Sequence, residues 1–206
     1  LKKCEDNGNS ITVDEGVRVI CADAFKDRKA LHTIILPQTL ETIGEESFRG
    51  CSNLEAMDVP EKTSRIGSSA FRDCISMKSL KVRNGYIKIG ERAFENCASL
   101  ESVSLPDGLT EIYGGVSNSC KSLVHIDLPK NLTILGESAF SDCVCLEKME
   151  VPEAVVKIDD LAFNGCTNLT KIVLHEGLRK IGKGAFKNCR NLKQIELPIS
   201  LSSIGD

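Results

Sequence analysis

Seven cysteines recur along the chain at a constant step of 23 residues. They are Cys51, Cys74, Cys97, Cys120, Cys143, Cys166 and Cys189. Cysteine serves proteins in disulfides, in metal sites and as a catalytic nucleophile. The chain has no Cys-x-x-Cys motif, and ligands in a single row could not close a tetrahedron around zinc. A nucleophilic thiol also needs a charged partner, and the three histidines, His32, His125 and His175, occupy different positions of the step. The pattern therefore predicts no enzyme, no metal and no cofactor.

Other chemistry-bearing patterns are also missing from the sequence. There is no glycine-rich phosphate loop, no Gly-x-Ser-x-Gly and no His-Glu-x-x-His. Acidic residues are scattered, so no carboxylate pair of the glycosidase kind stands out. The net charge is −3 without a lysine or arginine cluster, which argues against nucleic acid and anionic membranes as partners. No apolar run is long enough to insert into a membrane.

The step of 23 also governs other residue types. All seven phenylalanines lie on it, at 25, 48, 71, 94, 140, 163 and 186, and Ser117 takes the one remaining place. The repeated unit reads L-x-x-I-x-L-P-x-x-L-x-x-I-G-x-x-A-F-x-x-C-x-x. It runs through residues 11–206 without an insertion, as one domain that is truncated in its last unit. Residues 1–10 precede it as a lead-in or partial cap.

Each unit contains two short extended pieces and one compact segment. In "LHTIILP" (31–37) the apolar side chains at 34 and 36 have the period-2 spacing of a strand that the proline ends. "TIG" (42–44) is a second extended piece with a glycine turn. "EESFRGC" (45–51) has helical composition but covers only about two turns. Such a unit buries too little apolar surface to fold alone, so the units must stack into a solenoid.

The runs "LPKNLTILGESAFSDC" (128–143) and "LHEGLRKIGKGAFKNC" (174–189) identify a family resemblance. They resemble the leucine-rich repeats of the 23-residue BspA-like class, also called the Treponema pallidum type. The resemblance implies a right-handed curved β/α superhelix of about eight to nine units. Parallel strands would form one face and short helical turns the other. It also implies a bacterial cell-surface or secreted protein whose usual role is adhesion or protein binding.

Within a stack of this kind the repeated cysteines form a column. Equivalent residues of adjacent units lie about 5 Å apart. Their side chains point in parallel, whereas a disulfide needs a crossed dihedral angle near 90°. We therefore expect a column of buried, reduced thiols that act as small apolar residues. Cys4, Cys21 and Cys145 lie off the column, and Cys4 and Cys145 are the expected exposed thiols.

The longer extended piece of each unit offers the candidate binding face. If the side chains at 34 and 36 point inward, those at 33 and 35 and their equivalents point to solvent. This face is small and neutral in the middle and mixed in charge from 125 onward. Its candidate binding residues are Thr33, Ile35, Asp58, Lys81, His125, Asp127, Lys148, Glu150, Lys171, Val173, Gln194 and Glu196, with the small residues Ala56, Ser79, Ser102 and Ser104 between them.

One region departs from the repeat. Tyr86 stands at the turn-leucine place of "VRNGYIKIG" (82–90), and "YGGVS" (113–117) replaces Gly-x-x-Ala-Phe. The loss of a core phenylalanine leaves this unit either loose or filled from its neighbours. Tyr86 and Tyr113 are therefore candidates for contact at a break in the curvature, although sequence drift in a tolerant array explains the same residues.

The leading functional hypothesis is a non-enzymatic module that binds a protein ligand at a bacterial surface. One alternative is a rigid spacer of roughly 40 Å that presents other domains. Another is a glycan-binding or enzyme-associated domain. The chain stops in the middle of a unit, so end-to-end association with a second copy is a further expectation.

Overall fold

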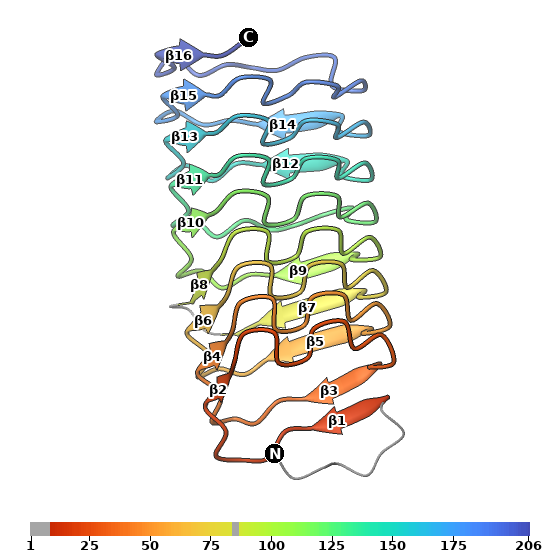
Figure 1. The fold of residues 1–206 in the computed structure, drawn as a ribbon. Coiled ribbons are helices and arrows are strands. Elements are labelled where there is room, and N and C mark those ends of the chain that lie inside the picture. The colour runs from red at the N-terminus through yellow and green to blue at the C-terminus, as the bar shows by residue number, and fades with distance from the viewer. Residues whose placement is uncertain (1–8, 84–86) are drawn as a thin grey trace.

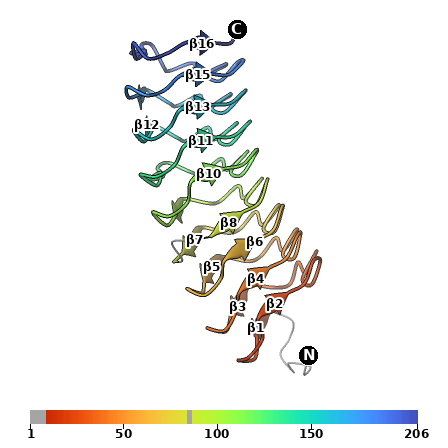
Figure 2. The same cartoon turned by 90° about the vertical axis from the view of Figure 1, so that its left-hand side faces the viewer.

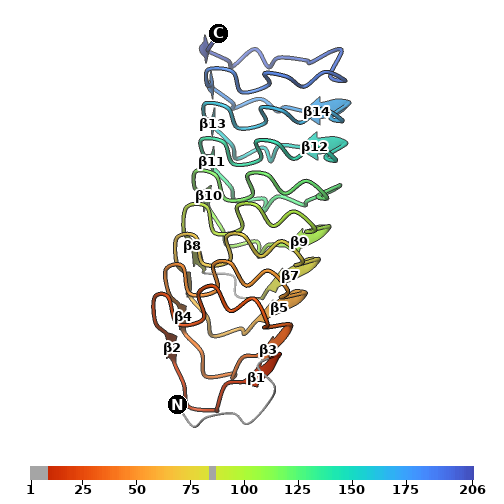
Figure 3. The same ribbon diagram turned by 45° about the vertical axis from the view of Figure 1, so that its right-hand side comes forward.

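The computed structural model describes residues 9–83 and 87–206, and these form a stack of parallel strands with two ladders (Figure 1). Both ladders run along the stack, on opposite sides of its core (Figures 1 and 3). The first ladder comprises β1 (Ser10–Thr12), β3 (Thr33–Ile35), β5 (Ala56–Val59), β7 (Ser79–Val82), β9 (Ser102–Ser104), β12 (Lys148–Glu150) and β14 (Lys171–Val173). The second comprises β2 (Val19–Ile20), β4 (Thr42–Ile43), β6 (Arg65–Ile66), β8 (Lys88–Ile89), β10 (Glu111–Ile112), β11 (Ile134–Leu135), β13 (Lys157–Ile158), β15 (Lys180–Ile181) and β16 (Ser203–Ile204).

The strand register confirms the repeat and the solenoid. Each paired residue has its partner 23 positions away, as in Met57 with Leu80 and Ile43 with Ile66. A shift of one residue would turn every apolar side chain of a strand toward water, so burial fixes this register. In β5, Met57 and Val59 are buried while Ala56 and Asp58 are exposed. The alternation that the sequence predicts is therefore present in the strands.

The core is one continuous column of apolar side chains between the ladders. Phenylalanine rings of successive units stack on one another, with centroids 5.0 Å apart for Phe25 and Phe48 and 5.2 Å apart for Phe48 and Phe71. Leucines and isoleucines of the two ladders enclose this stack. Because each ring contacts the rings above and below it, a unit obtains its core from its neighbours.

The helical turns expected opposite the strands are wrong. The compact segment of each unit is instead a series of tight turns with two residues of positive φ, such as Glu46 (50°) and Gly50 (71°), or Ser69 (54°) and Asp73 (61°). Left-handed residues interrupt a right-handed helix, so none propagates. Composition alone could not reveal them, since the left-handed positions also carry glutamate, serine and arginine.

The turns nevertheless satisfy their backbone groups by pairing between units. The amides of Glu46, Phe48 and Gly50 donate to carbonyls of the next unit at 2.8–3.0 Å. The amides of Arg49 and Cys51 close turns within their own unit, on the carbonyls of Glu46 at 3.0 Å and Phe48 at 3.1 Å. We call this repeated set of bonds the turn ladder. It is the third line of hydrogen bonds along the stack.

Within the described parts of the chain, no helix has the length and apolar character needed to cross a membrane.

Candidate functional site

The outer face of the first ladder carries the candidate binding residues. Their side chains are exposed to solvent, except for that of Val173, which is half-buried. Ile35 is 61% exposed, which is unusual for an isoleucine in a strand. Strand alternation builds most of the face, because the inward residues of the same strands, such as Ile34 and Met149, are buried in the core. The segments around His125 and Gln194 form no strand.

The C-terminal part of this face holds two adjacent lysines. Lys148 of β12 and Lys171 of β14 are direct register partners. Like charges placed opposite one another on a sheet destabilise it. Among the described residues, neither lysine makes an ion pair within 4.0 Å. The fold thus holds two exposed lysines in direct register, and neither has an ion-pair partner among the described residues.

A second column, of acidic residues, runs beside the lysines. Asp127, Glu150 and Glu196 lie two residues further along their units than His125, Lys148 and Gln194, and Val173 interrupts this column between Glu150 and Glu196. His125 and Asp127 are joined by a contact of 2.8 Å between Nε2 and Oδ1. Glu150 lies 3.8 Å from Nε2 of His175. This end of the face therefore offers a basic and an acidic column side by side.

The middle of the face is neutral and small apart from one ion pair. Arg83 donates from Nε and Nη2 to the two carboxylate oxygens of Asp58, at 2.9 and 2.6 Å. This bond lowers the pKa of the Asp58 carboxyl. Arg83 is a surface residue of this face that was not among the residues predicted from the sequence. Its signal was an arginine at the proline place of its unit, where a long side chain reaches back to the preceding strand.

The cysteine column is structural. Each of the seven column thiols is buried and donates a hydrogen bond to the carbonyl oxygen 26 residues earlier, at 3.0–3.2 Å. For Cys97 the acceptor is the carbonyl of Phe71. Burial raises the pKa of Cys51 from 9.0 to about 11 and that of Cys120 to about 12. Thiols that stay protonated are poor nucleophiles and poor metal ligands.

The structure also shows the state of the other cysteines and of the residue types that can bind a metal. All nine cysteines of the described residues are free thiols; Cys21 is exposed and Cys145 is half-buried, while Cys4 lies outside the described part. Among residues 9–83 and 87–206, no cluster of histidine, cysteine and acidic side chains could hold a metal ion.

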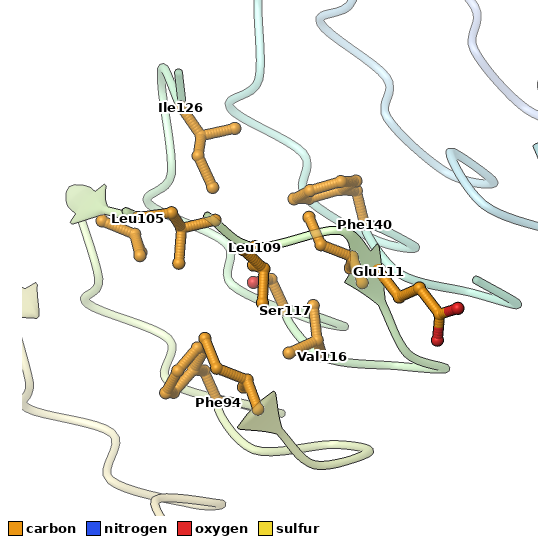
Figure 4. Close-up of a pocket in the computed structure, with 11 residues that line it drawn as sticks. Phe94, Leu105, Leu109, Glu111, Val116, Ser117, Ile126 and Phe140 are labelled. Atoms are coloured by element: carbon orange, nitrogen blue, oxygen red, sulfur yellow. The ribbon is translucent and has the colours of Figure 1, made fainter. Parts of the chain in front are cut away.

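The irregular region contains one exposed aromatic side chain and one small cavity. Tyr113 is 41% exposed, and a hydrogen bond to the Glu111 carboxylate raises the pKa of its phenol. Tyr86 lies outside the described residues. Ser117 is buried between Phe94 and Phe140, where a cavity of about 10 Å³ remains (Figure 4). Val116, which stands at the usual alanine place, is among the residues that line this cavity.

Comparisons with known proteins agree with this architecture. The family model described as "BspA type Leucine rich repeat region" matches residues 2–120 and 87–206. A leucine-rich repeat protein from Bacteroides ovatus is 29% identical with a TM-score of 0.88, over 94% of this chain and 50% of its own. A leucine-rich cell surface protein from Faecalibacterium prausnitzii is 28% identical with a TM-score of 0.59, over 96% and 59%.

A third solved structure is the leucine-rich repeat protein of T. pallidum. It is 25% identical, with a TM-score of 0.64, over 91% of this chain and 80% of its own. No curated protein matches the chain. The chain spans about half of the Bacteroides ovatus protein and less than two thirds of the Faecalibacterium prausnitzii protein.

Proposed function

Because the chain belongs to the BspA-type leucine-rich repeat family, we propose that it is a non-catalytic adhesion module that binds a protein ligand through the outer face of its first ladder. The family and its cell-surface relative support a protein-interaction role in general. The finer proposal concerns where and how binding occurs. We place the protein at the cell surface or in the secreted fraction, as the printed name of the Faecalibacterium prausnitzii relative suggests.

The pair Lys148 and Lys171 is the observation that carries the proposal. Two like charges in direct register cost stability in the free protein. A ligand that places a carboxylate between them would remove this repulsion and form charge-assisted hydrogen bonds. Binding would therefore gain from a contact that the free chain cannot make itself.

The neighbouring acidic column favours a protein over a polyanionic glycan. Asp127, Glu150 and Glu196 would repel a chain of sulfate or uronate groups along the same face. A protein surface can present acidic groups to the lysines and basic groups to this column. Complementary charge of this kind fixes register and raises the association rate. The ligand we propose is thus a folded protein with a mixed-charge surface.

A binding titration with two matched double variants tests the proposal. The test variant is Lys148→Glu with Lys171→Glu. The control is Arg65→Glu with Lys88→Glu, which reverses an exposed, equally spaced cationic pair on the second ladder that makes no ion pair among the described residues. Fibronectin, laminin, collagen and heparin form the panel, and thermal unfolding verifies that each variant is folded.

We expect saturable binding to one protein of the panel, weakened at least tenfold in the test variant and less than threefold in the control. Equal weakening in both variants would show that net charge, not this face, governs binding. Binding to heparin alone would overturn the protein ligand in favour of a glycan. Absence of binding across the panel would favour the alternative of a rigid spacer.

A further inference from the structure

Within residues 9–83 and 87–206, the second ladder is interrupted between β8 and β10. It consists of two sheets, β2-β4-β6-β8 and β10-β11-β13-β15-β16. At the repeated glycine position, the amide normally donates to an isoleucine or leucine carbonyl of the preceding unit, as Gly90 does to Ile66 at 2.9 Å and Gly136 to Ile112 at 2.8 Å. Tyr113 occupies this position in the fifth unit. Among the described residues from Gly44 onward, it is the one residue at this position whose amide makes no such bond. The column of second-ladder strands changes direction between β8 and β10 (Figure 2).

The first ladder opens on the other side of the same unit. β9 pairs with β7, but residues 125–127 form no strand, and pairing resumes only with β12 and β14. The fifth unit (residues 100–122) therefore pairs with the preceding unit through β9 and with the following unit through β10. We call this diagonal line of missing bonds the seam. Within the described residues, the first ladder also opens between β3 and β5 and after β14, but at both places the second ladder is continuous.

The ring stack is interrupted at the seam as well. Phe25, Phe48, Phe71 and Phe94 form one stack, and Phe140, Phe163 and Phe186 form another. Ser117 lies between them and contributes no ring. The small cavity around Ser117 is lined by side chains from both sides of the seam (Figure 4). Packing across this unit is thus weaker than in its neighbours.

Tyr113 gives a steric cause for the opening. A Cβ atom at Gly136 would lie 2.6 Å from the carbonyl oxygen of Ile112, and one at Gly90 would lie 2.5 Å from the amide of Ser68. The column therefore admits glycine most easily. Asp159 also carries a side chain here, yet its amide still donates to Leu135 at 2.8 Å. A Cβ atom alone does not open the ladder, so the opening needs the bulky Tyr113 together with the missing ring.

One line of bonds continues across the seam. Phe94 donates to Val116 at 2.8 Å, and Ser117 donates to Ala139 at 2.9 Å, so the turn ladder is intact. The thiols of Cys120 and Cys143 donate to the carbonyls of Phe94 and Ser117 at 3.2 Å. The two halves are therefore connected along the turn ladder, whereas each strand ladder lacks strand pairing at the seam.

We infer that the fifth unit is a joint, about which the N-terminal and C-terminal blocks of the solenoid bend relative to each other. The joint also divides the first-ladder face. Its small, neutral part with Ser79 and Ser102 belongs to the N-terminal block, and the charged part from His125 onward belongs to the C-terminal block. A ligand that contacts both parts would select one bend, which couples the joint to binding.

Distance distributions between two spin labels test the joint. The labels replace Arg65 and Lys180, which are exposed, lie on either side of the seam and are separated by about 24 Å at roughly 4.8 Å per unit. Cys4, Cys21 and Cys145 are changed to serine so that only the introduced thiols react. The same label pair is measured with Tyr113→Gly alone, with Tyr113→Gly, Val116→Ala and Ser117→Phe together, and with Asp159→Gly. The last variant restores the column glycine where the ladder is already continuous, and so serves as the matched control.

We expect a broad distribution of label–label distances in the chain with the unaltered joint. The triple variant should narrow the width of this distribution at least twofold, and Tyr113→Gly alone should narrow it by less. Asp159→Gly should leave the width unchanged. If the triple variant does not fold, the single Tyr113→Gly change must still narrow the distribution. An unchanged width in every folded variant, or equal narrowing by Asp159→Gly, would overturn the inference.

Discussion

Between the third unit (residues 54–76) and the fourth (77–99), every repeated contact is present. Between the fourth unit and the fifth, only some of these contacts remain. The third and fourth units share β5-β7 and β6-β8 pairing, stacked rings of Phe71 and Phe94, and the turn ladder. The fourth and fifth units keep the turn ladder and the thiol bond of Cys120, but they lose the β8-β10 pairing and the ring contact.

The difference shows which contacts the stack cannot lose. Ring stacking and one strand pairing on each side are dispensable for one unit, because the fold continues beyond it. The turn ladder and the buried thiols persist through regular and irregular units alike. This persistence gives the cysteine column its physical reason, since each thiol satisfies a carbonyl at the edge that holds neighbouring units together.

High pH should produce the largest effect, and it should act on both regions. The folded-state pKa is raised for column thiols such as Cys51, to about 11, and Cys120, to about 12, whereas unfolded thiols ionise near 9.0; the pKa of Cys189 is instead lowered by its hydrogen bond with Cys166. The stabilisation is therefore fully present below pH 9 and is lost as the pH rises toward the folded values. Each such thiol should cost about 1.4 kcal/mol per pH unit above 9. Urea unfolding at pH 8, 9 and 10 measures this slope.

Cys120→Ala is the control for this titration. Removal of one buried thiol should make the alkaline slope shallower by about 1.4 kcal/mol per pH unit. A slope that is unchanged in this variant would show that other groups, not the column thiols, cause the alkaline loss.

Substitution at the ring position should separate the two regions. Phe71 is fully buried between Phe48 and Phe94, with centroids 5.2 and 6.1 Å away. Phe71→Ala should lower the free energy of unfolding by about 3–5 kcal/mol. Ser117→Ala should change it by about 1 kcal/mol or less, because no ring is lost. Urea unfolding of both variants measures the difference, and similar losses would contradict our description of the fifth unit.

Removal of a column thiol should have a smaller effect than the loss of a ring, and the effect should be the same in both regions. Cys97 and Cys120 are both fully buried, and each donates to a phenylalanine carbonyl at 3.2 Å. Cys97→Ala and Cys120→Ala should each cost about 1–2 kcal/mol at pH 7, since each loses one buried hydrogen bond and one sulfur atom. A much smaller cost at Cys120 would mean that the turn edge is also loosened at the seam.

The sequence predicted the parts of the structure that follow from periodicity. A step of 23 sets the strand register, the ring stack and the thiol column, because equivalent residues must stack. It could not reveal the left-handed residues at Glu46 and Ser69, which replaced the expected helical turns. It also missed the Arg83–Asp58 pair, since a contact across 25 residues depends on where a long side chain turns. The irregular unit was visible from Ser117, but the diagonal course of the seam was not.

Native-state hydrogen exchange at the repeated glycine position tests most directly whether the fifth unit is the weak point of the stack. The amides to compare are Gly67 and Gly90 before the seam, and Gly136 and Asp159 after it, all of which donate to equivalent carbonyls at 2.8–2.9 Å. We expect Gly90 and Gly136, which border the seam, to exchange at least tenfold faster than Gly67 and Asp159. If the stack frays only from its ends, the order will be reversed, with Gly90 and Gly136 the slowest, and the account of a central joint will be wrong.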